Sequence, residues 1–68
     1  MPHHRYEVRV AGRLSDRASD AFGDMEVDAA PVETVISSRT IDEAGLHGLL
    51  ELCRTLGLEV TSFSRLPS

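Results

Sequence analysis

Residues 42–57 read DEAGLHGLLELCRTLG, and the architecture follows from this stretch. Its apolar residues recur at intervals of three and four, which is the spacing of one buried helix face. These residues are Leu46, Leu49, Leu50, Cys53 and Leu56. Asp42 is suited to an N-cap, and Gly57 to the position just past a helix end. The pattern predicts a long amphipathic helix that packs on a second layer.

The segments on either side of this helix alternate apolar and polar residues, as half-buried strands do. We expect strands at residues 6–10, 25–29, 33–38 and 58–64. A helix of about two turns is expected between Ser15, an N-cap candidate, and Gly23, a stop signal. Val35 and Ile36 are adjacent and cannot share a face of one strand, so the orientation of the third strand stays open.

The resulting order is strand, helix, strand, strand, helix, strand. Each helix is long enough to carry the chain from one strand to a parallel partner. Two such units interleave into a ferredoxin-like βαββαβ two-layer sandwich, with a four-stranded antiparallel sheet and two helices on one face. The fold class is therefore α+β. We expect a single domain over residues 1–68, with flexible ends at 1–4 and 66–68.

The composition fits a small folded domain that gains from self-association. Val, Ile, Leu and Phe make up about a quarter of the 68 residues, above the level of roughly 20% at which disorder becomes the better expectation. A chain of this length buries only about 60% of its unfolded surface, so a second copy is a simple source of stability. Seven basic residues, all arginine, face eleven acidic ones, for a net charge of −4. This balance disfavours nucleic acid as a partner.

Cys53 is the only cysteine, so no disulfide can form within the chain. It lies on the apolar stripe, which favours a buried structural thiol over a nucleophile. No apolar run is long enough for a membrane span or a signal peptide, so we expect a cytoplasmic protein without a membrane partner. Glu43, His47 and Glu51 lie one helical turn apart and are interpreted as a solvated stripe rather than a metal site. No catalytic residue, cofactor or metal is expected.

Two stretches resemble a group of short bacterial proteins of unknown function. They are Ile41–Leu50 with the following Leu56-Gly57-Leu58, and the opening Tyr6–Leu14. The group shares a Tyr-Glu-Val-Arg-Val strand opening and an Asp-Glu-Ala-Gly-Leu-His-Gly-Leu-Leu helix. The resemblance implies no activity, because none is established for the group. Many members have Gly-Pro in the turn before the helix, where this chain has Ser38-Arg39-Thr40.

Gly45, His47 and Gly48 form the first candidate site, inside the long helix. A glycine in a helix interior costs about 1 kcal/mol relative to alanine, so some contact should compensate for each one. Close packing is the favoured explanation. The alternative is a ligand pocket lined by His47, whose imidazole titrates near neutral pH and can bind metal.

The sheet face away from the helices is the second candidate site. Strict alternation places there Glu7, Arg9, Glu26, Asp28, Glu59, Thr61 and Phe63. RNA-binding domains of this topology carry stacking aromatic rings among positive charges on that face, whereas this face is acidic. We therefore interpret it as a candidate subunit interface, with Phe63, Thr61 and Arg9 in the contact.

The leading hypothesis is a cytoplasmic, non-enzymatic homodimer that acts as a binding or regulatory module, with another protein as a further candidate partner. One alternative is a small-ligand sensor resembling ACT-type domains, with its ligand near Gly45, His47 and Gly48. Another is a small dimeric α+β-barrel or tautomerase-like enzyme. Met1-Pro2 and the strand that follows look like the start of the tautomerase superfamily, in which removal of Met exposes a proline amine as general base. That similarity ends near Arg17.

Overall fold

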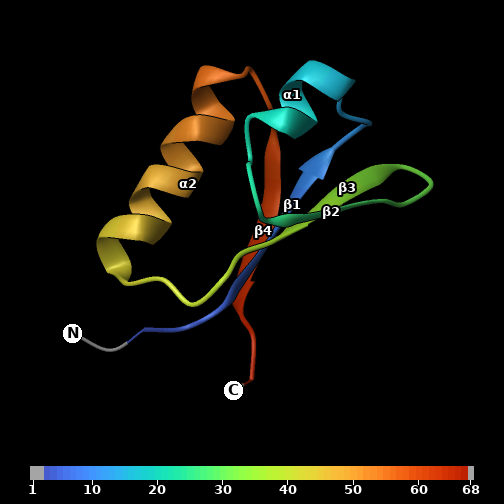
Figure 1. Ribbon diagram of the computed structural model, residues 1–68. Coiled ribbons are helices and arrows are strands. Elements are labelled where there is room, and N and C mark those ends of the chain that lie inside the picture. The colour runs from blue at the N-terminus through green and yellow to red at the C-terminus, as the bar shows by residue number, and fades with distance from the viewer. Residues whose placement is uncertain (1–2, 68) are drawn as a thin grey trace.

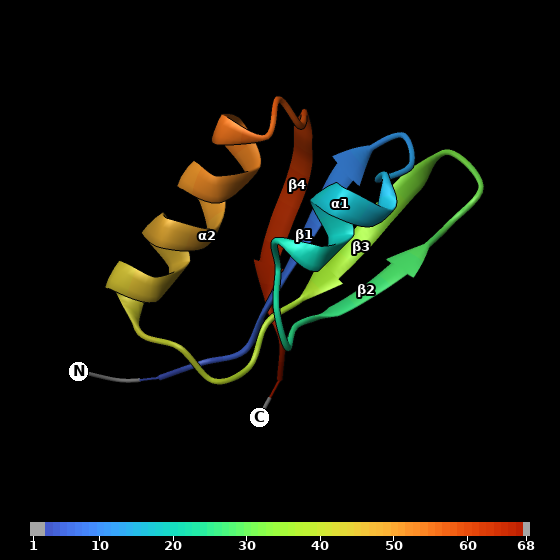
Figure 2. The same ribbon diagram turned by 45° about the horizontal axis from the view of Figure 1, so that its top comes forward.

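The computed structural model describes residues 3–67 and has two helices and four strands over that range. The elements are β1 (Tyr6–Ala11), α1 (Asp16–Asp20), β2 (Glu26–Ala29), β3 (Glu33–Ser37), α2 (Glu43–Thr55) and β4 (Val60–Arg65). Their order is the predicted one. Figures 1 and 2 show both helices on the same side of the sheet. The predicted α+β fold class is therefore confirmed.

The strands form one antiparallel sheet in the order β2-β3-β1-β4. β1 pairs with β3 on one side and with β4 on the other, and β2 pairs with β3 as a hairpin. The strands that α1 connects are thus separated by β3, and the strands that α2 connects are separated by β1. This interleaving of two split βαβ units is the ferredoxin-like arrangement. It leaves β2 and β4 as the two outer strands.

The core lies between the sheet and the helices. Its buried apolar side chains are Val8, Val10, Phe22, Ile36, Leu49 and Cys53. Residues directly opposite each other in an antiparallel pair lie on one face, and Val8 is opposite Ile36. Ile36 and Thr34 are buried while Val35 is only half-buried. The third strand therefore directs Thr34 and Ile36 at the helices, which answers the question that the sequence left open.

α2 begins and ends where the sequence predicts. The Asp42 carboxylate accepts a hydrogen bond from the Gly45 N–H at 2.8 Å, which satisfies one of the free donors of the first turn. Gly57 follows the helix with a φ of 75°, a left-handed conformation that glycine adopts without strain. Leu49 and Cys53 are the buried residues of the helix. The apolar spacing thus marks the face that contacts the sheet.

Backbone pairing continues past the ends of the strands. The sequence predicts flexible ends at residues 1–4 and 66–68, whereas in the structure His4 and Ile41 exchange two backbone hydrogen bonds of 2.8 and 2.9 Å. Leu66 is half-buried.

Met1 and Pro2, on which the tautomerase-like alternative rests, and Ser68 lie outside the described residues. Across residues 3–67, no helix combines the length and the apolar character that crossing a membrane requires.

Candidate functional site

β4 does not orient its side chains as strict alternation predicts. β1 and β4 pair in register from Tyr6 opposite Arg65 to Arg9 opposite Ser62, but the next pair is Val10 with Val60. Thr61 is therefore an extra residue on β4, a β-bulge. Its hydroxyl donates a hydrogen bond to the Arg9 carbonyl at 3.2 Å. One extra residue reverses the face of every residue that follows it.

Phe63 consequently lies on the helix side of the sheet, opposite Val8. The prediction that it faces the open side was wrong, because the bulge shifts the alternation of β4 by one residue before Phe63. Its partner Val8 is fully buried, yet Phe63 remains 52% exposed. Val60, opposite Val10 on the same face, is 36% exposed. The helices therefore leave the β4 side of this face only partly covered.

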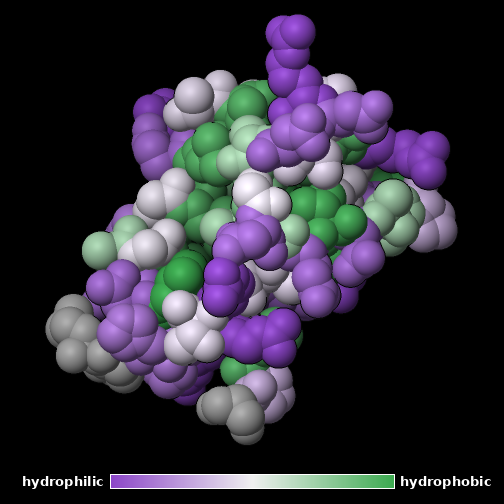
Figure 3. Space-filling view, viewed as in Figure 1, coloured by the Kyte–Doolittle hydropathy of each residue, from purple (hydrophilic) through white to green (hydrophobic). Residues whose placement is uncertain are grey.

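β4 is also an outer strand, and all six of its residues are exposed. Arg65 is its one charged residue, whereas the shorter outer strand β2 carries Glu26 and Asp28 among its four residues. Charges and short length protect the edge of a sheet from pairing with another chain. β2 has both forms of protection, and β4 has little of either. Figure 3 shows further hydrophobic surface along α2, bordered by hydrophilic side chains.

The open face of the sheet is polar, and its acidic residues outnumber its one basic residue. Register places on it Glu7, Arg9, Glu26, Asp28, Glu33, Val35, Ser37, Ser62 and Ser64. Arg9 donates a hydrogen bond to Glu33 at 2.7 Å and lies 3.5 Å from a Glu7 carboxylate oxygen. The bond to Glu33, followed by the charge of Glu7, raises the pKa of Arg9. Among these residues there is no aromatic ring on which a base could stack.

The three residues of the candidate site on α2 lie in different surroundings. His47 and Gly48 are exposed, and Gly45 is half-buried. A Cβ at Gly45 would lie 2.9 Å from the Ile41 Cβ, whereas nothing lies within 4 Å of a Cβ at Gly48. Close packing therefore explains Gly45, and this explanation was wrong for Gly48.

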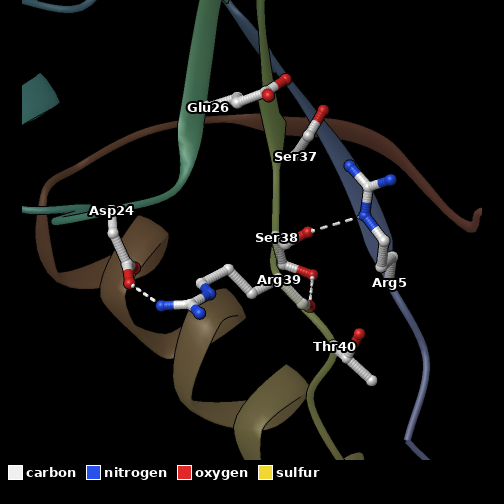
Figure 4. A pocket seen from close by; sticks show the side chains of 7 residues that line it. All are labelled: Arg5, Asp24, Glu26, Ser37, Ser38, Arg39 and Thr40. Atoms are coloured by element: carbon white, nitrogen blue, oxygen red, sulfur yellow. Dashed lines mark hydrogen bonds and ion pairs between the residues drawn. The ribbon is translucent and has the colours of Figure 1, made fainter.

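A polar pocket that the sequence did not predict lies where β2 begins and β3 ends (Figure 4). It has a volume of about 440 Å³ and is lined by Arg5, Asp24, Glu26, Ser37, Ser38, Arg39 and Thr40. The Arg39 guanidinium forms an ion pair with the Asp24 carboxylate and donates a hydrogen bond to it. This hydrogen bond lowers the pKa of the Asp24 carboxyl. The Arg5 Nε donates to the Ser38 carbonyl at 3.4 Å. The lining comes from separate segments that only the folded sheet brings together.

The lining of this pocket has no net charge, because it includes two cationic and two anionic side chains. Within residues 3–67, no group of three or more histidine, cysteine or acidic side chains is arranged to hold a metal ion.

A family model described as a domain of unknown function, DUF8691, matches residues 5–64. The chain belongs to the DUF8691 family. No curated protein matches it, and no solved structure does.

The DUF8691 match includes both stretches on which the resemblance to proteins of unknown function rests, and it assigns no activity. Cys53 in this DUF8691 chain is fully buried and is not in a disulfide. Burial raises the pKa of its thiol, because desolvation disfavours the thiolate. The prediction of a buried thiol is thus confirmed. The neutral thiol packs as a small apolar side chain within the core.

The two helix glycines of the DUF8691 chain should respond in opposite ways to alanine. We predict that Gly48→Ala raises the free energy of unfolding by up to about 1 kcal/mol, because the added methyl enters open space and helix propensity improves. Gly45→Ala should give no gain, because its methyl would press against Ile41. Denaturant-induced unfolding of both variants at one protein concentration measures the difference. Equal gains at the two positions would contradict the Ile41 contact.

Proposed function

We propose that this DUF8691 domain is a cytoplasmic, non-enzymatic module that forms a homodimer and serves binding or regulation in that form. The observation that carries the proposal is the β4 edge, where six consecutive residues are exposed and Phe63 is 52% exposed. A long, weakly charged and partly apolar outer strand is a surface prone to pair with another chain. A second copy of the same chain is the partner that is always present.

The small core makes such pairing favourable. Among residues 3–67, six apolar side chains are buried. Full burial of a phenylalanine side chain stabilises by about 1.5–3 kcal/mol. Because half of Phe63 is already covered, a second copy that covers the rest adds about 1 kcal/mol per chain.

The placement of the reactive groups supports a non-enzymatic role. The Cys53 thiol is buried in the core, where a substrate has no access to it. In the polar pocket, Arg39 and Asp24 are paired with each other. His47 is exposed on α2, and it lines neither the polar pocket nor the pocket of about 270 Å³ beside α1. The acidic open face without an aromatic ring supports a partner other than nucleic acid.

Size-exclusion chromatography with light scattering over a concentration series tests the proposal. We expect a dimer at micromolar concentrations for the natural sequence. Phe63→Ser should weaken the dimer by tenfold to a hundredfold, because about 1 kcal/mol is lost on each of two chains. Val32→Ser is the matched control, since Val32 is 81% exposed at the tip of the β2–β3 hairpin and should not affect assembly. A monomer at every concentration would refute the homodimer.

A further inference from the structure

We infer that the homodimer forms by antiparallel pairing of two β4 strands about a two-fold axis at Ser64, which joins the two sheets into one. This inference rests on the proposed homodimer and specifies its geometry. It follows from the backbone groups that β4 leaves free, from the residues that bound them, and from the charges on the two outer strands.

The hydrogen bonds between β1 and β4 show which backbone groups of β4 are free. The Leu66 N–H donates to the Arg5 carbonyl at 2.8 Å. Along an antiparallel strand, residues alternate between bonding to one neighbour and to the other. Counting back from Leu66, Ser64 bonds to β1, whereas Phe63 and Arg65 direct their N–H and C=O groups to the outer edge.

The regular part of this outer edge is short. Thr61 forms the bulge on one side, where the ladder is disrupted. Pro67, the next residue that would direct its backbone outward, has no N–H to donate. An antiparallel pairing that uses the backbone N–H and C=O groups of both Phe63 and Arg65 has its two-fold axis midway between these residues, at Ser64. Phe63 then lies opposite the partner's Arg65.

The side chains favour the same register. Phe63 and the partner's Arg65 would share the helix side of the joined sheet, where a guanidinium can lie against an aromatic ring. An axis at Arg65 would instead place two like charges opposite each other. An axis at Phe63 would set Arg65 against the bulge at the partner's Thr61 and lose hydrogen bonds. Pairing through β2 would oppose Glu26 and Asp28 to the same acids of a second copy.

Disulfide formation by single cysteine variants tests the register. Residues opposed on the axis in a non-hydrogen-bonded pair have Cα atoms about 4.5 Å apart, which is within the range of a disulfide. Ser64→Cys should therefore form a covalent dimer on mild oxidation. Ser62→Cys is the matched control, since Ser62 is on the same strand and face, and its two copies would be about 13 Å apart. Cys53 is buried in both variants and should not react.

Non-reducing electrophoresis follows the cross-linking at a protein concentration at which light scattering reports a dimer. We expect Ser64→Cys to cross-link at least tenfold faster than Ser62→Cys, with both variants showing the natural circular dichroism spectrum. A dimer in which Ser62→Cys reacts as fast, or Ser64→Cys does not react, would overturn the register and leave the proposed homodimer standing. A strict monomer would overturn both.

Discussion

Replacing Ile36 with alanine should leave the domain largely unfolded at 25 °C. Ile36 is fully buried in β3, opposite Val8 on one side and Val27 on the other. Removing a buried isoleucine side chain down to its Cβ costs about 2–5 kcal/mol, and a core of this size rarely supplies more than about 3–5 kcal/mol in total. Urea unfolding followed by far-UV circular dichroism, at a fixed protein concentration, measures the loss.

Val35→Ala is the control for Ile36→Ala. Val35 is the preceding residue of β3, is half-buried and faces the open side of the sheet. Its replacement removes mainly strand propensity, which is worth about 1 kcal/mol or less. Similar losses for the two variants would mean that β3 does not bury one face preferentially, and the two-layer architecture would be refuted.

Phe22→Ala should release α1 from the sheet. α1 has five residues and none of them is buried, whereas Phe22, just beyond its end, is 2% exposed and belongs to the core. We expect a loss of at most about 3 kcal/mol, the low end of the cost of a phenylalanine-to-alanine change in a core, because α1 can detach while the sheet and α2 remain folded. Hydrogen exchange should show early loss of protection at the Ser19 N–H, which bonds to the Ser15 carbonyl at 2.9 Å.

Ala21→Ser provides the comparison for Phe22→Ala. Ala21 is the exposed C-cap of α1, so its replacement should change stability by no more than about 0.5 kcal/mol. If Phe22→Ala left the exchange at Ser19 and the overall stability unchanged, the anchoring role of Phe22 would be wrong. This pair also tests why so short a helix persists, since a helix of five residues is not stable by itself in water.

Some features of the functional candidates could be predicted from local sequence patterns, whereas others depend on the tertiary structure. The burial of Cys53 was predictable, because its place on the apolar stripe depends only on neighbours along one helix. The polar pocket was not predictable, because Arg5, Asp24 and Arg39 become neighbours only when β1, the segment before β2 and the end of β3 assemble. The difference between Gly45 and Gly48 was equally hidden, since it depends on where the Ile41 side chain lies.

Local patterns in this chain were sufficient for the element order, both helix N-caps, the fold class and most of the core. Helical and strand periodicity, like capping, is a property of residues a few positions apart, so it can be recognised without knowledge of the fold. Three-dimensional pairing alone decided the face on which Phe63 lies. The bulge at Thr61 is defined by how β4 pairs with Arg9 and Val10 of β1, which are more than fifty positions away in the chain. The alternation of residues within β4 therefore gives no sign of it.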